Sequence, residues 1–114
     1  MDRRKHPRKY LLYFSRVIDR KSGILLGYLS DLTKDGLMLI SETPIALGQD
    51  FDVLMDLPED FAPREQLALS VHSLWSKPDV DPTYFNTGFN ITVLDENDIG
   101  LVERIIERYG FRNA

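Results

Sequence analysis

Two short groups of residues carry the side chains that could do chemistry in this sequence. The first is Arg4-Lys5-His6-Pro7-Arg8, in which two arginines stand four positions apart and Arg3 directly precedes them. The second is Asp31-Leu32-Thr33-Lys34-Asp35-Gly36. A guanidinium group can grip a phosphate, or the O6/N7 edge of guanine, with two hydrogen bonds, and it also stacks on flat rings. The arginines therefore suit an anionic ligand that carries flat rings.

The second group complements the first. The Asp31 carboxylate can accept hydrogen bonds from the N–H groups on the Watson–Crick edge of guanine. Thr33 supplies a hydroxyl that both donates and accepts, and Gly36 allows positive φ and a close backbone approach at a turn. Asp, Thr and Gly also favour ordinary turns, so these residues alone do not select one nucleotide.

The distribution of charge narrows the class of ligand. The 114 residues carry a formal net charge of −4, whereas residues 1–9 hold five basic side chains against the single Asp2. A basic arm on an acidic domain suggests a small anion bound locally, or else a solvated tail. The acidic balance argues against nucleic-acid binding, including a small barrel for single strands, because such proteins need a basic face.

The two groups of residues are positioned by short segments whose composition and alternation predict β-strands. The predicted strands are 10–18, 24–32, 37–40, 51–57, 67–75 and 85–93, and Ser22-Gly23 is the predicted turn between the first two. Apolar residues then recur at helical spacing from Ile99 to Tyr109, with Asp95 or Asn97 as the cap and Gly110 at the end. Six strands in antiparallel hairpin order and one helix predict a mainly β fold, a small barrel or sandwich with the helix on one end.

The alternation within two strands predicts which side chains form the core. On the fifth strand the predicted core face holds Leu67, Leu69, Val71 and Trp75. His72 lies on the opposite, exposed face. On the last strand one face is lined by Phe85, Phe89, Ile91 and Val93.

The two groups together, in this order and about twenty residues apart, resemble the signature of PilZ domains. That signature is R-x-x-x-R near the N-terminus followed by D/N-x-S/T-x-x-G. Three further segments are similar to the family: 44–48 to the loop after its third strand, 71–75 to its fifth strand and 87–91 to its sixth. The similarity extends from Arg3 to about Tyr109. One departure is Thr33 where the family usually has serine, and the added methyl group restricts the rotamers of the hydroxyl.

The resemblance implies a single domain over residues 1–114. It would comprise a flexible basic arm (1–9), a six-stranded antiparallel β-barrel (10–94) and a C-terminal helix (95–110). The family's ligand is cyclic di-GMP, and no other cofactor is implied. The resemblance further implies that Arg4 and Arg8, with Arg3 as a lesser candidate, contact guanine and phosphate from the arm. Asp31 and Thr33 would hold a guanine on the barrel surface, and Gly36 would shape the turn.

The leading hypothesis is a receptor or adaptor that couples cyclic di-GMP to an effector protein through ordering of the arm. The alternative is a PilZ-like docking module for pilus or flagellar control that binds no nucleotide. A homodimer is left open. Motility and biofilm control are expectations at the level of the family only.

Catalytic and metal-binding functions are not expected. The chain has no cysteine, and its two histidines, His6 and His72, share no ligand spacing. No motif surrounds a nucleophile or pairs two general bases, so the sequence predicts a binding protein and not an enzyme. No apolar stretch reaches the length of a membrane span and no signal peptide begins the chain, so the expected location is the cytoplasm.

Overall fold

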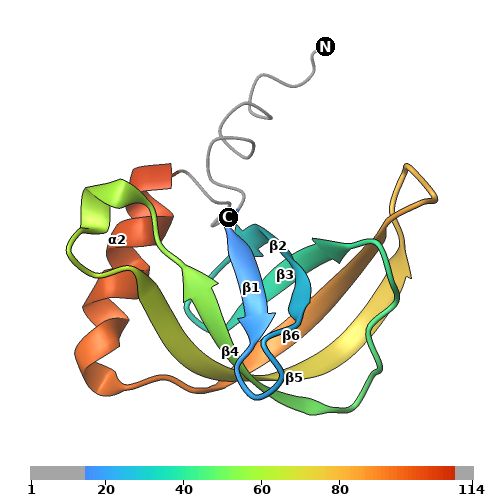
Figure 1. The fold of residues 1–114 in the computed structure, drawn as a ribbon, viewed down its shortest axis with the longest axis horizontal. Coiled ribbons are helices and arrows are strands. Elements are labelled where there is room, and N and C mark those ends of the chain that lie inside the picture. Colours follow the sequence, from blue (N-terminus) through green and yellow to red (C-terminus); the bar gives the residue numbers. More distant parts are fainter. Residues whose placement is uncertain (1–14, 110–114) are drawn as a thin grey trace.

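The computed structural model describes residues 15–109, which form a closed antiparallel barrel and one α-helix (Figure 1). The strands are β1 (Arg16–Asp19), β2 (Leu25–Leu32), β3 (Gly36–Ser41), β4 (Asp50–Asp56), β5 (Gln66–Pro78) and β6 (Phe85–Val93). They are followed by α2 (Ile99–Tyr109), and single 3₁₀ turns occur at η1 (Glu59–Phe61) and η2 (Glu96–Asp98). The predicted six-stranded antiparallel barrel with a C-terminal helix is therefore confirmed. The predicted arm (1–9) and the start of the predicted first strand (10–14) lie outside the described residues.

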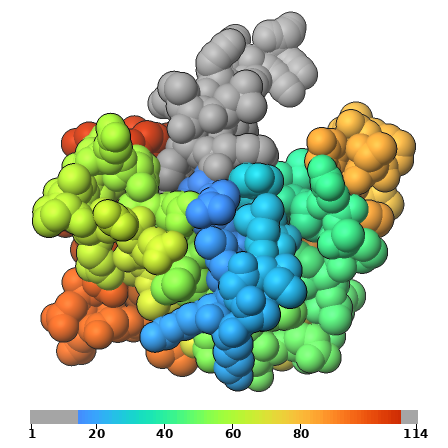
Figure 2. Space-filling view, in the orientation of Figure 1, coloured from blue at the N-terminus to red at the C-terminus, as the bar shows by residue number. Residues whose placement is uncertain are grey.

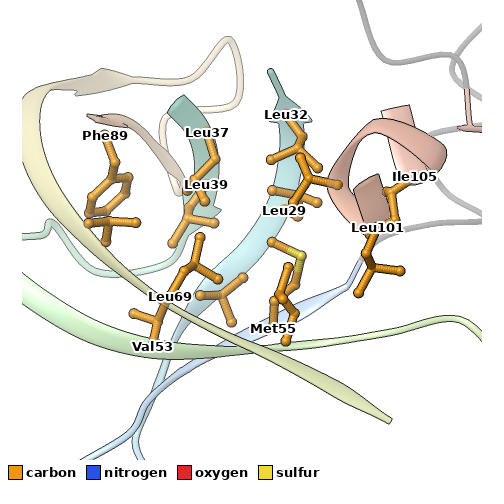
Figure 3. Close-up of a cluster of buried hydrophobic side chains, with 14 of the residues drawn as sticks. Leu29, Leu32, Leu37, Leu39, Val53, Met55, Leu69, Phe89, Leu101 and Ile105 are labelled. Atoms are coloured by element: carbon orange, nitrogen blue, oxygen red, sulfur yellow. The ribbon is translucent and has the colours of Figure 1, made fainter. Parts of the chain in front are cut away.

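The barrel closes because β1 pairs on both sides. Its neighbours are β2 and β4, and the strand order is β1-β2-β3-β6-β5-β4. Inward positions alternate along each strand, so one apolar core fills the barrel (Figure 3). Leu101, Val102 and Ile105 of α2 are buried in the same core and thereby fix the helix to the barrel. Gly23, with φ of 75°, forms the predicted turn between β1 and β2.

An extra residue in β5 reverses the faces of the rest of that strand. Ser73 pairs with Phe89 and Trp75 pairs with Gly88, which leaves Leu74 as an unpaired bulge residue. Residues up to Ser73 keep the predicted alternation, with Leu67, Leu69 and Val71 buried. Beyond the bulge, Trp75 lies on the outer face and is 39% exposed, so the prediction that it belongs to the core is wrong.

The same correction applies at the end of β6. Val71 pairs with Ile91 and Ser70 pairs with Val93, so Thr92 is an extra residue in β6. Val93 is therefore displaced from the face of Phe89 and is 61% exposed, so the prediction that it shares this face is wrong.

The predicted helix over 95–110 is divided into two elements. The Asp95 side chain accepts a hydrogen bond from the Asn97 N–H at 2.9 Å and caps η2, and α2 begins only at Ile99. Arg64 donates two hydrogen bonds of 3.2 Å to the carboxylate of Asp98, the last residue of η2. Gly110, the predicted end of the helix, lies outside the described residues.

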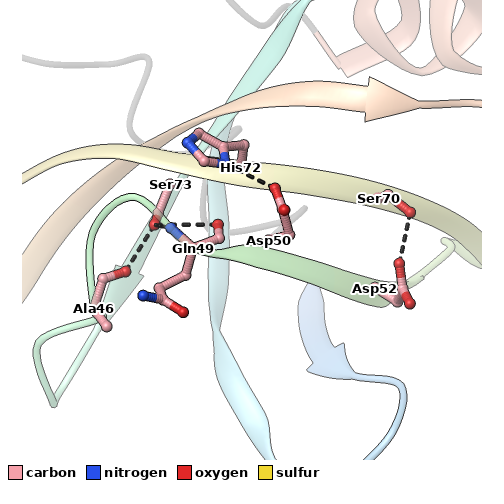
Figure 4. Close-up of polar contacts among 7 residues, drawn as sticks. All are labelled: Ala46, Gln49, Asp50, Asp52, Ser70, His72 and Ser73. Carbon is pink, nitrogen blue, oxygen red and sulfur yellow. Dashed lines mark hydrogen bonds and ion pairs between the residues drawn. The ribbon is translucent and has the colours of Figure 1, made fainter.

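Polar side chains on β4 and β5 pair across the outer face of the barrel (Figure 4). His72 Nδ1 lies 2.7 Å from a carboxylate oxygen of Asp50, and Ser70 donates a 2.7 Å hydrogen bond to Asp52. The predicted outward position of His72 is confirmed, and its partner is a carboxylate. Ser73, which is buried, instead donates to the Ala46 carbonyl at 2.7 Å and so fastens the loop between β3 and β4.

Candidate ligand-binding site

Thr33 organises the turn between β2 and β3. Its backbone N–H donates to the Gly36 carbonyl at 2.9 Å, and its Oγ1 accepts from the N–H groups of Asp35 at 3.3 Å and Gly36 at 3.1 Å. The Oγ1 also lies 3.3 Å from the Gly36 carbonyl oxygen. The Thr33 hydroxyl, which is expected to contact a ligand, thus already forms hydrogen bonds within the turn.

Gly36 is required for a reason other than positive φ. Among residues 15–109, positive φ occurs only at Gly23 and Gly48, so Gly36 does not use the positive φ that glycine allows. A Cβ added at Gly36 would lie 2.5 Å from the Phe89 carbonyl oxygen. The expected close backbone approach is therefore present, and it is to β6.

Asp31 lies at the end of β2 with its side chain half-buried on the outer face. One carboxylate oxygen accepts from the Leu32 N–H at 3.0 Å, and within residues 15–109 no other hydrogen bond of this carboxylate occurs. Leu29 pairs with Leu39 and Asp31 with Met38, so Ser30 is an extra residue of β2. This bulge directs Asp31 outward, where the second carboxylate oxygen is open to a donor.

Asp31 begins a row of side chains that crosses the outer face of four strands. Consecutive cross-strand partners across β2, β3, β6 and β5 are Asp31, Met38, Gly88 and Trp75. An open depression of about 180 Å³ lies over this row, bordered by Asp31, Thr33 and Gly36 on one side and by Leu74 and Trp75 on the other. The structure therefore brings together the three residues of the second predicted group and places an aromatic ring opposite them.

Trp75 is the residue of this depression that the sequence interpretation missed as a site residue. A Cβ at Gly88 would lie 2.3 Å from the indole Nε1, so the indole packs against the bare backbone of Gly88. The ammonium group of Lys77 stands 5.3 Å from the centre of the Trp75 ring, within the range of a cation–π interaction. Trp75 pairs directly with Gly88 across the two strands, and this pairing marks it as a site residue. The pairing could not be predicted, because it depends on the bulge at Leu74.

The arginines of the first predicted group, Arg3, Arg4 and Arg8, lie outside the described residues. Within residues 15–109 no cluster of three or more His, Asp or Glu side chains is arranged to hold a metal ion. In the same part of the chain no helix is long and apolar enough to cross a membrane.

The fold is a small closed β-barrel, and the comparison with protein families identifies its class. The chain matches the PilZ domain over residues 2–108 and belongs to that family. This range includes both groups of residues from which the resemblance was inferred. No curated protein matches the chain.

The fold is similar to that of a solved structure. It is the Inhibitor of motility (MotI/DgrA) of Bacillus subtilis, with a TM-score of 0.68 and 11% sequence identity. The alignment covers 85% of this chain and 46% of that chain. The present chain thus corresponds to less than half of that protein, and at this identity the similarity concerns the fold alone.

Proposed function

We propose that this PilZ domain is a receptor for cyclic di-GMP and that it acts by binding, without catalysis. The observation that carries the proposal is the convergence of Asp31, Thr33 and Gly36 at one edge of a depression whose other edge is Trp75. Family membership supports the same ligand, because PilZ domains are generally cyclic di-GMP receptors. A carboxylate facing a large aromatic ring suits a guanine, which offers N–H donors on one edge and a flat face for stacking.

Each residue has a distinct role in the proposal. The outward oxygen of Asp31 accepts from the Watson–Crick edge of a guanine. Thr33 keeps the turn rigid and holds Asp31 beside it, so its contribution is mainly to position the site. Arg4 and Arg8, with Arg3 beside them, contact guanine and phosphate from the arm and supply the positive charge that the barrel surface lacks at Asp31.

Signalling would follow from ordering of the arm. When the ligand neutralises the arginines and holds the arm against the barrel, the surface offered to an effector protein changes. The motility function in the name of the structural neighbour suggests one process for such an effector. A docking module that binds no nucleotide is the alternative, and the engagement of the Thr33 hydroxyl within its turn is the observation that favours it.

The test is a titration of the protein with cyclic di-GMP, followed by calorimetry and by the emission of Trp75. Trp75 is the single tryptophan of the chain, so its emission reports on this depression without a label. The double variant Arg4→Ala/Arg8→Ala is expected to lose binding, and Asp31→Ala to weaken it roughly tenfold or more, since hydrogen bonds to charged groups are strong.

Asp35→Ala is the matched control, because Asp35 lies in the same turn and within residues 15–109 its carboxylate has no hydrogen bond or ion pair. Binding by this variant should equal that of the unchanged protein, and GTP serves as the control ligand. If the unchanged protein gives neither heat nor a change in emission, the receptor proposal is wrong and the docking module takes its place.

A further inference from the structure

A second hollow adjoins the depression on the outer face of β2 and β3. It is a groove of about 730 Å³, within the usual range of small-molecule sites of roughly 300–1,000 Å³. Its walls include Leu25, Tyr28, Ile40, Glu42 and Tyr84. In Figure 2 the hairpin between β5 and β6, coloured yellow to orange, projects beside the segment that follows β3, and Tyr84 belongs to this hairpin.

The register of the strands places the groove directly beside the depression. The row next to that of Asp31 and Trp75 consists of Tyr28, Ile40, Asn86 and Lys77. On β3, β6 and β5 these residues stand two positions from the first row, a separation of about 7 Å, and on β2 they stand three positions away because of the bulge at Ser30. Tyr28 and Ile40 begin the groove at one end of this row, and Lys77 contacts Trp75 at the other end.

The groove repeats the chemistry of the depression. Tyr84 supplies a flat ring as Trp75 does, and Glu42 supplies a carboxylate as Asp31 does. Within residues 15–109 the Glu42 carboxylate has no hydrogen bond or ion pair, so it is open to a donor. In the register of the β5–β6 hairpin, Lys77 lies between the position of Trp75 and the pair of Asp79 and Tyr84. Lys77 is exposed and, among residues 15–109, forms no ion pair.

The backbone at Tyr84 is held in place by the turn of its hairpin. Its N–H donates to the Asp81 carbonyl at 3.0 Å, and its carbonyl accepts from the Asp79 N–H at 2.9 Å. The Asp79 side chain in turn accepts from Asn86 at 2.9 Å, a hydrogen bond that lowers the pKa of that carboxyl and keeps it charged. An ordered wall loses little conformational entropy on binding.

We infer that the groove of Tyr84 and Glu42 is a second base-binding subsite, and that Lys77 binds a phosphate between it and the depression. The inference rests on the proposed function, since cyclic di-GMP carries two guanines joined through phosphates. One guanine lies against Trp75 and Asp31, and the Glu42 carboxylate accepts from the Watson–Crick edge of a second guanine stacked on Tyr84. The lysine ammonium group meets the negative charge between the two bases.

The test is calorimetric titration of the full chain with cyclic di-GMP. Tyr84→Ala should weaken binding roughly tenfold, since stacking of a base on an aromatic side chain is substantial, whereas Tyr84→Phe should bind as the unchanged protein does. Glu42→Gln should weaken binding as well, because the amide offers a single acceptor oxygen. Lys77→Ala should weaken binding and make the affinity less sensitive to salt, a readout that a purely structural role would not change.

Lys21→Ala is the matched control, because Lys21 is an exposed lysine in the turn between β1 and β2. Circular dichroism of each variant verifies the fold. If the unchanged protein binds and the Tyr84, Glu42 and Lys77 variants bind equally well, the second subsite is refuted and the proposed function stands. If the unchanged protein does not bind cyclic di-GMP, both proposals fall together.

Discussion

Gly88 fixes the position of the tryptophan at the site. It lies in the middle of β6, a position at which glycine weakens a strand. The indole of Trp75 packs directly against its backbone. Any side chain at this position would occupy the space of the ring. The residue is therefore part of the floor of the depression, although it has no group that could contact a ligand chemically.

Gly88→Ala is expected to displace the indole and destabilise the protein. The new Cβ would lie 2.3 Å from Nε1, 2.4 Å from Cε2 and 2.6 Å from Cζ2 of Trp75. Crowding of this kind usually costs about 1–3 kcal/mol. Urea denaturation measures the loss, and a shift of the tryptophan emission maximum reports the displacement. Gly100→Ala is the control, because no atom within 4 Å would contact its Cβ, and it should leave stability unchanged or slightly raised. An unchanged emission maximum in Gly88→Ala would contradict the packing described for Trp75.

At the scale of the element, alternation and turn residues were sufficient to predict six strands and a helix. The errors came from extra residues. The bulge at Leu74 turned Trp75 outward and the bulge at Thr92 exposed Val93, because an unpaired residue exchanges the two faces of the strand beyond it. The pairing with the neighbouring strand decides which residue is left unpaired, so the sequence of β5 or β6 alone does not predict the bulge.

Only the part of the candidate site that lies in a local motif could be predicted from the sequence. Asp31 and Thr33 were found because a local motif contains them, and the structure places them together at one edge of the depression. The need for Gly36 was predicted, but its cause lies in the Phe89 carbonyl of β6, far away in the sequence. Trp75, Lys77 and Tyr84 belong to no local motif, since only the barrel brings them to the face of Asp31.

The helix α2 illustrates how charges attach one element to another. Arg108 donates a 2.8 Å hydrogen bond to the carboxylate of Asp60 in η1. This bond, together with one from Tyr109, lowers the pKa of Asp60. Burial, followed by the hydrogen bond to Asp60, raises the pKa of the Tyr109 hydroxyl. The polar contacts that Arg108 and Tyr109 make with η1 therefore converge on a single carboxylate, that of Asp60.

Acid should weaken this attachment selectively. The pKa of Asp60 is lower in the folded than in the unfolded protein, where it is about 3.9. The ionised carboxylate therefore contributes to the stability of the fold above about pH 3.9, and this contribution is lost as the pH falls through the lowered pKa of the folded state. The difference in unfolding midpoint between the unchanged protein and Asp60→Asn should therefore be largest near pH 6 and shrink progressively below about pH 4. Thermal unfolding followed at 222 nm across this range measures it. In an Arg108→Ala background the difference should be small at every pH, and a constant difference in the unchanged background would refute the assignment.

For the molecule as a whole, closure of the barrel determines where a ligand can bind. The interior is filled with apolar side chains contributed by the strands and by α2. In the receptor proposal the ligand therefore binds on the outer face of β2, β3, β6 and β5. A site on a closed barrel can be supported by residues from distant parts of the chain without opening the core. In the receptor proposal the barrel remains unchanged while the arm is the element that responds.

Saturating cyclic di-GMP should therefore stabilise the whole barrel against heat. A ligand at 100 times its Kd stabilises the folded state by about 2.7 kcal/mol, which for a domain of this size raises Tm by roughly 10 °C. Scanning calorimetry with and without the ligand measures the shift. The double variant Arg4→Ala/Arg8→Ala should melt near the temperature of the unchanged protein without ligand, because the apolar core described over residues 15–109 begins at Val17. It should not respond to cyclic di-GMP. An equal shift in the double variant would place the binding energy on the barrel alone and remove the arm from the mechanism.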